Sequence, residues 1–494
     1  MNPLKQLAGQ TVIYGLSSIV GRLINFLLVF LYTRVFLPQE YGVVTEMYTY
    51  MYLLLIVLTY GMETALFRFS EKTPAIRNTV FSTTLLSVLS TSSLFVLLVV
   101  LFRQPLAEVM RYPDNVEYIV LMGGIIGADA LAAIPFARLR SENKAMRFAL
   151  LKLTGIAVNI VLVLFFLVLC PWLLEHGTPG MQQTVSTLYK PGIGVGYVFI
   201  ANLIASLTVL LLLLPVMASA KAVFDRMLLR KMLLYALPLL VAGLAGWANE
   251  ALDKLLLKYI LPEDIALSQV GIYGAAYKLS VMMTIFIQAF RFAAEPFFFA
   301  QSAEKNARET YARVMKYFVL ACLIIFLGIT LFIDIVKNLL GSEFHEGIGV
   351  VPILLLANMF LGIYFNLSIW YKLTDKTMYG AWFSVVGAII TIVLNIWWIP
   401  MFGYHGSAWA TLICYVALAS LSYAFGQKHY KIPYELPRLF FMIILALAVY
   451  FASYLTTTLP AVWMYATHLI LIGFFLAAII LADRSLIGDL KTIR

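Results

Sequence analysis

Charged side chains are scarce in this sequence: Asp, Glu, Lys and Arg make up only 12% of its 494 residues. A typical soluble domain carries about 25% charged residues and about 45–50% apolar ones, whereas 62% of this chain is hydrophobic. A chain of this composition that folded in water would leave much apolar surface exposed. The shortage of charge therefore argues against an ordinary soluble domain and favours a protein that folds within a lipid bilayer.

Cysteine is also rare, and Cys170, Cys322 and Cys414 all lie in or beside apolar segments. Cysteines placed in this way give neither a disulfide framework nor the paired spacing of a metal site. We find no Walker motif, no histidine cluster, and no residues that nominate a nucleophile with a general base. We therefore expect no cofactor, no metal and no enzymatic activity. The net charge of +10 lies in short loops between apolar runs, which points to membrane topology rather than to nucleic acid.

Apolar runs follow one another along almost the whole chain. A helix needs about 20 apolar residues to cross roughly 30 Å of hydrocarbon. The expected spans are residues 11–33, 44–67, 79–102, 118–137, 150–170, 195–217, 232–257, 269–290, 317–336, 350–371, 379–399, 405–426, 439–456 and 462–482. The first run is too long for the core of a cleaved signal peptide, so we expect it to remain as the first helix. The sequence thus predicts an all-α integral membrane protein with about 14 transmembrane helices.

Lysine and arginine are distributed unevenly among the loops between these runs. If the N-terminus is cytoplasmic, most of them fall in cytoplasmic loops. The exceptions in the opposite loops are Arg34, Arg103, Arg111, Lys190, Lys258 and Lys337. Cytoplasmic loops of membrane proteins carry such an excess of positive charge, and a single miscounted span would exchange the sides of all later loops. The pattern therefore predicts that both ends of the chain are cytoplasmic.

A weak internal repeat relates two parts of the chain at an offset of 232 residues. The matches pair Tyr41 and Gly42 with Tyr273 and Gly274, Glu63 and Phe67 with Glu295 and Phe299, and Lys144, Met146, Ala149 and Gly155 with Lys376, Met378, Ala381 and Gly387. The offset covers six helices, so both copies have the same orientation, and transporters with such parallel repeats bind substrate between their halves. We predict two parallel six-helix repeats that form two lobes, residues 1–220 and 221–430. A C-terminal helix pair with a cytoplasmic tail, residues 431–494, follows them.

Charged residues inside the expected spans are the candidate functional residues, because each costs roughly 2.5–3.5 kcal/mol in the bilayer unless it is paired or hydrated. The cations are Arg22, Lys254 and Lys278, and the acids are Glu46, Glu63, Asp129, Glu250 and Asp253. Arg22 shares one face of the first helix with Ser18 and Asn25. Glu250 can pair with Lys254 one turn away, and the repeat relates Glu46 to Lys278.

Two hypotheses explain these charges. In the first, Arg22, Lys254 and Lys278 receive an anionic substrate in a polar cavity between the lobes. The other polar residues assigned to that cavity are Asn25, Glu46, Asp129, Glu250 and Asp253. A carboxylate such as Asp129 or Asp253 would then carry a coupling proton or sodium ion. In the second, the charges only pair with one another and hold the lobes together.

The segment Leu37-Pro38-Gln39-Glu40-Tyr41-Gly42 resembles the start of bacterial polysaccharide flippases. These are the Wzx-like O-antigen flippase family of the multidrug/oligosaccharidyl-lipid/polysaccharide exporter superfamily. The second copy, from Val270 to Lys278, is similar to the start of helix 8 in that family. The resemblance implies a V-shaped pair of lobes with a cationic cavity in a bacterial inner (plasma) membrane. The implied function is to move an undecaprenyl-diphosphate-linked oligosaccharide from the cytoplasmic to the periplasmic leaflet for surface polysaccharide, such as lipopolysaccharide, by alternating access.

The resemblance also implies partners and a purpose for the last two helices. In related lipid II flippases, helices 13 and 14 supply a groove for the lipid chain. The implied partners are a lipid-linked oligosaccharide, membrane lipids and a coupling ion, H⁺ or Na⁺, and they include no nucleic acid. Two alternatives stay open. One is a drug or cation antiporter of the same superfamily, although such antiporters usually stop at twelve helices. The other is a lipid II flippase, although this chain has only Arg22 where those proteins carry an arginine cluster.

Overall fold

The computed structural model describes residues 20–21, 23–24, 26–72, 76–220 and 223–482. Every regular element in this part is helical, and 13 helices in it are long and apolar enough to cross a membrane. A shorter apolar helix, Phe26–Val35, belongs to the first expected span, of which residues 11–19, 22 and 25 lie outside the described residues. The prediction of an all-α protein with many membrane spans is thereby confirmed. The chain divides into two compact units, Met1–Gly271 and Ile272–Arg494.

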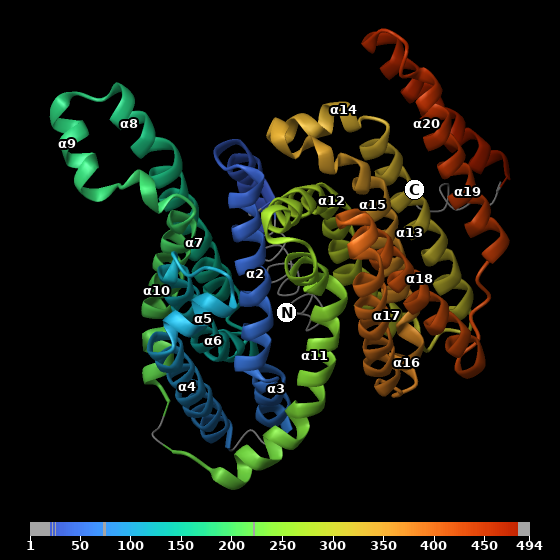
Figure 1. Cartoon of the computed structure of the whole chain (residues 1–494). Coiled ribbons are helices and arrows are strands. Elements are labelled where there is room, and N and C mark those ends of the chain that lie inside the picture. Colours follow the sequence, from blue (N-terminus) through green and yellow to red (C-terminus); the bar gives the residue numbers. More distant parts are fainter. Residues whose placement is uncertain (1–19, 22, 25, 73–75, 221–222, 483–494) are drawn as a thin grey trace. The chain divides into compact units, whose positions relative to one another are not determined.

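The first unit is built around α6, which packs against α2, α4 and α10 (Figure 1). Helix α11 packs against α2 and α3. The helices are α2 (Pro38–Thr59), α3 (Met62–Lys72), α4 (Arg77–Leu101), α5 (Arg103–Val109), α6 (Val116–Ser141), α7 (Ala145–Leu164), α8 (Cys170–His176), α9 (Pro179–Leu188), α10 (Gly196–Ala218) and α11 (Arg226–Ile260). The apolar core between them includes Phe81, Ile134 and Met232, all fully or almost fully buried.

The second expected span, residues 44–67, is broken into α2 and α3. Tyr60 and Gly61 have φ angles of 31° and 74°, in a region that glycine enters without the steric cost of a Cβ atom. Helix α3 then begins at Met62 and carries Glu63 in its first turn, where the helix dipole favours a carboxylate. The break therefore places Glu63 in the first turn of α3, within the candidate membrane span Pro38–Glu71.

The second unit contains most of α12 (Glu263–Gln301), which begins in the first unit. Its other helices are α13 (Ala307–Thr330), α14 (Ile333–Val336), α15 (Val351–Leu367), α16 (Ile369–Leu373), α17 (Met378–Phe402), α18 (Tyr404–His429), α19 (Leu436–Ser453) and α20 (Ala461–Ala482). Helix α18 packs against α15 and α17, and α13 packs against α15 and α19. Helix α20 packs against α19, so the last two helices form a pair.

The two units repeat one packing pattern. Helix α10 contacts α6 and α7, as α18 contacts α15 and α17, and α6 contacts α4, as α15 contacts α13. The unit boundary at Gly271 nevertheless differs from the repeat boundary after residue 220, because α11 packs on α2 and α3. The division into lobes at 1–220, 221–430 and 431–494 therefore stays a prediction from the repeat.

The duplication is visible even in the backbone of one turn. Asn143 and Asp375, which the 232-residue offset relates, have φ angles of 57° and 55°. The residue after each, Lys144 or Lys376, donates its N–H to a carbonyl of the preceding helix at 2.9 Å and 2.8 Å, respectively. Such a bond closes the end of a helix, and Asn and Asp enter the left-handed region more readily than most residues. The same helix end thus occurs in both copies.

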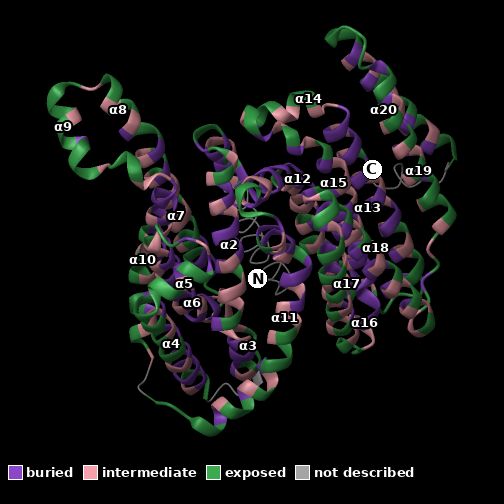
Figure 2. Ribbon diagram, viewed as in Figure 1, coloured by how far each residue is buried: buried purple, intermediate pink, exposed green. Residues whose placement is uncertain are grey.

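Large apolar side chains stay exposed along single faces of the spans (Figure 2). On α4 they include Leu94, Leu97 and Leu101, and on α17 they include Ile389, Val393 and Ile396. The spacing of three and four residues puts each set on one helix face. Apolar stripes of this kind fit contact with lipid chains, since a bilayer removes the cost of their exposure.

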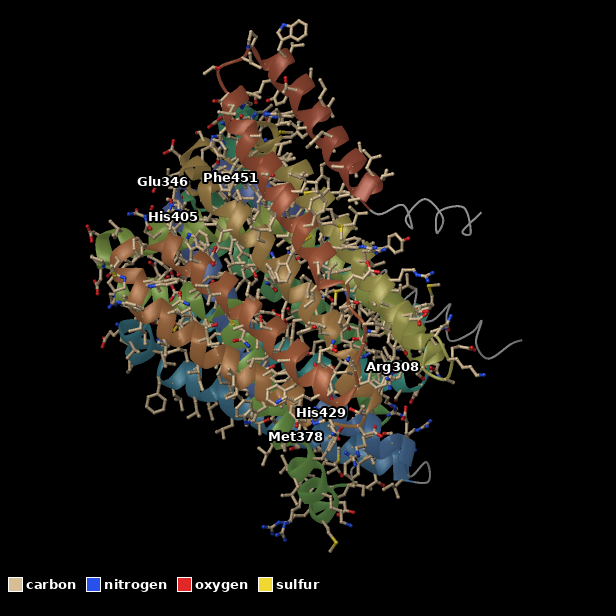
Figure 3. The ribbon with its side chains drawn as sticks, turned by 90° about the vertical axis from the view of Figure 1, so that its right-hand side faces the viewer. Arg308, Glu346, Met378, His405, His429 and Phe451 are labelled. Carbon is tan, nitrogen blue, oxygen red and sulfur yellow. The ribbon has the colours of Figure 1, made fainter. Side chains whose placement is uncertain are left out.

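The span ends of the second unit separate into two groups. In Figure 3, Arg308, Met378 and His429 lie toward one end, and Glu346 and His405 lie toward the other. The loops that the sequence assigned to a common side therefore meet at one end of this unit. Which end faces the cytoplasm stays a prediction from the loop charges.

Candidate functional site

Two residues of the predicted cavity, Arg22 and Asn25, lie outside the described residues, as does Ser18. The other predicted cavity residues lie on α2, α6, α11 and α12. Lys278 is exposed on α12, in the second unit. Its counterpart in the repeat, Glu46, is fully buried in the first unit, so the two equivalent positions have opposite environments.

Lys254 lies on the buried face of α11 beside Asp253. Its Nζ donates to the Asp253 carboxylate at 3.1 Å and to the main-chain carbonyl of Glu250 at 3.3 Å. The side chains of the pair expose only 10% and 3% of their surface. The sequence predicted an ion pair between the side chains of Lys254 and Glu250. The described structure shows an ion pair of Lys254 with Asp253, whose carboxylate also accepts the Lys254 main-chain N–H at 2.9 Å, and the pairing with Glu250 stays a prediction.

Glu46 of α2 forms an enclosed ion pair with Lys258 near the end of α11. The Lys258 Nζ donates to both carboxylate oxygens, at 2.8 and 2.7 Å, and to the carbonyl of Met110 at 2.6 Å. The hydroxyl of Tyr112 also donates to Glu46. Burial is the main cause that raises the pKa of Tyr112 well above its usual value, and the nearby Glu46 carboxylate raises it further. The hydroxyl therefore stays protonated and remains a donor. The pair joins α2, α11 and the segment before α6, which fits the hypothesis of structural pairing.

Lys258 is a correction to the sequence analysis, which placed it in a loop. Helix α11 continues to Ile260 and buries the side chain almost completely. A signal was present, because Lys258 follows Lys254 at a spacing of four and so shares its helix face. A buried glutamate on a neighbouring span also requires a cation. Sequence alone could not choose between Lys254 and Lys258 as that cation.

Asp129 of α6 lies at the centre of a polar group inside the first unit. It interacts with the hydroxyl of Ser206 and lies within electrostatic reach of Lys152 on α7. Ser206 donates to Asn202 at 3.4 Å, and Asn202 donates to the hydroxyl of Tyr48 on α2 at 2.9 Å. Polar groups from four helices thus converge near one carboxylate. In the described residues, no group of three or more His, Cys, Asp or Glu side chains could hold a metal ion.

Two equivalent ion pairs lie in the two copies of the repeat. Arg140 donates to Glu63 at 2.6 Å, and Lys372 donates to Glu295 at 2.7 Å. The 232-residue offset relates both partners, although the sequence analysis used only the two glutamates. Both pairs are partly exposed, with 36% and 38% of the side-chain surface accessible in the first and 25% and 37% in the second. An ion pair retained in both copies points to a role in the shared fold.

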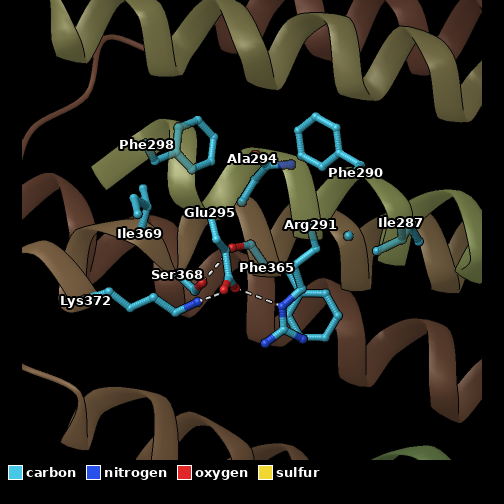
Figure 4. Close-up of a pocket in the computed structure, with 12 residues that line it drawn as sticks. Ile287, Phe290, Arg291, Ala294, Glu295, Phe298, Phe365, Ser368, Ile369 and Lys372 are labelled. Carbon is cyan, nitrogen blue, oxygen red and sulfur yellow. Dashed lines mark hydrogen bonds and ion pairs between the residues drawn. The ribbon is translucent and has the colours of Figure 1, made fainter. Parts of the chain in front are cut away.

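In the second copy a pocket adjoins this ion pair (Figure 4). Arg291, one turn before Glu295 on α12, donates its Nε to the oxygen that Lys372 also contacts, at 2.8 Å. Its guanidinium lies 4.6 Å from the centre of the Phe365 ring. Asn366 of α15 lines the same pocket. The sequence analysis assigned Arg291 to a loop because it ended the span at residue 290, whereas α12 continues to Gln301.

Comparison with solved structures identifies the class of this fold. The chain is similar to the structure described as "Lipid II flippase MurJ, inward closed conformation", with a TM-score of 0.67 and 16% identity over 96% of this chain and 100% of the other. It is also similar to a multidrug resistance MATE family transporter of the MOP superfamily. In its inward-facing conformation the TM-score is 0.64, with 15% identity over 85% of this chain and 94% of that one. The outward-facing conformation gives 0.58, with 13% identity over 85% and 95%. The chain therefore has the fold of these membrane flippases and transporters.

The family follows from the sequence itself. The pattern that defines the family described as "Polysaccharide biosynthesis protein" matches residues 7–300, which is more than half of the chain. The chain belongs to this family. No curated protein sequence matches it.

Proposed function

We propose that the protein is a flippase that moves an undecaprenyl-diphosphate-linked oligosaccharide from the cytoplasmic to the periplasmic leaflet of a bacterial inner membrane. The product would serve the assembly of a surface polysaccharide such as O-antigen or lipopolysaccharide. One observation carries the proposal: a member of a polysaccharide biosynthesis family has the fold of membrane transporters. Sugars and diphosphates cannot enter hydrocarbon without a large desolvation cost. A transporter fold within polysaccharide biosynthesis therefore fits the step at which a lipid-linked intermediate crosses the membrane.

The substrate's chemistry suggests a role for each charged position. A diphosphate needs cations, for which we propose Arg22, Lys254 and Lys278. Lys254 enters this role already paired with Asp253, so it would have to exchange that carboxylate for the substrate.

The lipid chain needs an apolar surface, which we assign to the pair α19 and α20. Leu469, Ile470 and Phe474 of α20 are each more than half exposed.

Coupling to an ion gradient is assigned to Asp129. A carboxylate with hydroxyl and amide neighbours can hold a proton or a sodium ion without a dedicated metal cage. The likeness to multidrug transporters favours a second candidate, an antiporter that exchanges a drug or cation for such an ion. The likeness to the lipid II flippase keeps that substrate as a third candidate.

Deletion of the gene followed by analysis of the lipid carrier tests the flippase proposal. We expect undecaprenyl-linked oligosaccharide to accumulate in the cytoplasmic leaflet and surface polysaccharide to fall. Restoring the full chain should reverse both changes. If surface polysaccharide is unchanged and drug sensitivity rises, the result favours the antiporter over the flippase as the function of this protein. If peptidoglycan synthesis stops instead, the substrate is lipid II.

Single neutral variants test the cavity cations. Arg22→Gln, Lys254→Met and Lys278→Gln should each abolish restoration of surface polysaccharide while the membrane still contains the protein. Lys305→Gln provides a matched control, because Lys305 is an exposed cation in the loop between α12 and α13. Full restoration by all three cavity variants would refute the assignment.

A further inference from the structure

The pocket between α12 and the helices α15 and α16 carries an excess of positive charge. Arg291 and Lys372 both contact one oxygen of Glu295, so two cations share one carboxylate. The Arg291 side chain is 41% exposed, and its Nη groups make no hydrogen bond to any described residue. Figure 4 shows the guanidinium beside the Phe365 ring with its Nη atoms directed away from Glu295. A planar guanidinium held in this way presents donors suited to an oxyanion.

A buried amide in the same pocket lacks a partner. Asn366 lines the pocket and is only 5% exposed, yet its side-chain nitrogen has no hydrogen-bond partner among the described residues. Leaving a buried donor unsatisfied is costly, so such a group in a folded protein calls for a ligand, water or ion. The pocket holds about 300 Å³ of empty space, including the part open to the surroundings. The amide nitrogen itself is covered by protein, so an oxyanion in the open part of the pocket would reach it after neighbouring side chains move.

The first copy of the repeat lacks both features. At the positions equivalent to Arg291 and Asn366 it has Thr59 and Ile134. In its ion pair Glu63 contacts Arg140, and Lys152 is a further cation within electrostatic reach of Glu63. The Arg140 Nε also finds no hydrogen-bond partner in the described structure. However, the rings of Phe67 and Phe148 lie 5.2 and 5.8 Å from that guanidinium. The direct contact of Arg291 with the glutamate and the unpartnered amide are therefore additions of the second copy and are not needed to maintain the shared ion pair.

We infer that the Arg291–Lys372–Asn366 pocket binds a phosphate oxyanion, with the Arg291 guanidinium and the Asn366 amide as donors and Lys372 as the second cation. Glu295 holds the two cations together and leaves a net positive charge for the ligand. Basic pockets between membrane helices near a membrane surface commonly bind phosphate-bearing lipid head groups. Phe292, Phe297 and Phe299 of α12 are each more than 40% exposed around Glu295. These rings would contact the chain of a lipid phosphate or prenyl phosphate.

The site's chemistry deepens the proposed function but does not depend on it. If the protein moves a diphosphate-linked lipid, this pocket would hold the phosphate near the end of the second unit where Arg308 and Met378 lie. If it moves something else, the same donors would bind a membrane phospholipid. Binding of a phosphate probe and movement of an oligosaccharide can therefore fail separately.

The test measures binding to the purified full-length chain in uncharged detergent, by the ligand-dependent rise in its thermal unfolding midpoint. The probes are inorganic diphosphate, farnesyl diphosphate and dihexanoyl phosphatidylglycerol. The variants Arg291→Thr and Asn366→Ile introduce the residues of the first copy. Arg140→Gln breaks the equivalent ion pair in the first copy and provides the matched control. Arg291→Gln is a second variant in case Arg291→Thr fails to fold without ligand.

We expect both lipid probes to bind the wild type and the Arg140→Gln control with similar affinity. Affinity should fall at least tenfold in Arg291→Thr or Arg291→Gln and several-fold in Asn366→Ile. Stronger binding of the lipid probes than of inorganic diphosphate would identify a lipid as the source of the phosphate, and equal binding would identify the free anion. Unchanged affinity of the Arg291 variants for all three probes would overturn the site, as would an equal loss in Arg140→Gln. Unchanged surface polysaccharide in the deletion strain would refute the proposed flippase function and leave the phosphate site standing.

Discussion

The two copies of the repeat agree in some charges and differ in others. Both keep a glutamate paired with a basic residue, Glu63 with Arg140 and Glu295 with Lys372, at 2.6 and 2.7 Å. Both also end the preceding helix with a residue in the left-handed conformation. Features retained in both copies, at the same points of the same helices, are explained by the shared fold.

The charges found in only one copy form a different set. The first copy has Asp129, where the second has Leu361. Glu46 of the first copy pairs with Lys258 of the second copy, whose counterpart in the first is Phe26. The second copy has Arg291 beside its ion pair, where the first has Thr59. A charged group that is present in one copy but absent from the other is not required by the shared fold. Its presence therefore needs a separate explanation. For Glu46 the structure supplies a local reason, because the pair joins α2 to α11, whereas Asp129 and Arg291 remain candidates for function.

The largest effect on stability should come from the enclosed pair of Glu46 and Lys258 in the first unit. Removing one partner of a buried ion pair typically costs about 3–5 kcal/mol, because it leaves an uncompensated charge. We therefore expect Lys258→Met to lower the free energy of unfolding in detergent by that amount. The double variant Lys258→Met with Glu46→Gln should recover much of the loss. A single variant as stable as the wild type would show that Glu46 does not depend on Lys258.

A smaller effect on the free energy of unfolding, equal in the two copies, should come from the helix ends at Asn143 and Asp375. A left-handed residue with a Cβ atom costs roughly 1–2 kcal/mol, and Asn and Asp bear less of that cost than other residues. We expect Asn143→Ala and Asp375→Ala each to lower the free energy of unfolding by about 1 kcal/mol. Glycine at either position should cause no such loss. A clear loss in only one copy would mean that the equivalence of the two turns is superficial.

The smallest effect should be a pH dependence confined to the first copy. Burial raises the pKa of Glu142, but hydrogen bonds and attraction from Arg138 and Lys144 outweigh it and hold the pKa below its usual value. The counterpart of Glu142 is Thr374, which does not titrate. A carboxyl with a lowered folded-state pKa contributes stability above its unfolded-state pKa and loses it as pH falls through the folded-state pKa.

The difference in unfolding midpoint between the wild type and Glu142→Gln isolates this contribution from other carboxyl groups. We expect the difference to be constant from pH 7 down to about pH 5 and to shrink at lower pH. A difference that does not change with pH would contradict the proposed hydrogen bonds.

Much of the fold could be predicted from the sequence, because long apolar runs and loop charges depend on local composition. The break at Tyr60 could not, since a single glycine in an apolar run is ordinary in membrane helices. The candidate site was harder to predict. Asp129 and Lys254 stood out as charges inside spans, whereas Lys258 and Arg291 lay just beyond the expected span ends. Their partners depend on which helices pack together, and loop charges carry no information about that. The repeat could have paired Arg140 with Lys372, and that match would have pointed to the pocket.

A leaflet-resolved assay tests most directly whether this chain moves a lipid-linked oligosaccharide and whether the charges peculiar to one copy serve that movement. Purified protein in vesicles would receive the lipid-linked sugar in one leaflet, and its appearance in the other would be followed with a sugar-binding protein. We expect transfer by the wild type and by Arg140→Gln, and a loss of at least tenfold in Asp129→Asn. No transfer by the wild type under any proton, sodium or voltage gradient would contradict the proposed function. A loss in Arg140→Gln as large as in Asp129→Asn would contradict the distinction between shared and copy-specific charges.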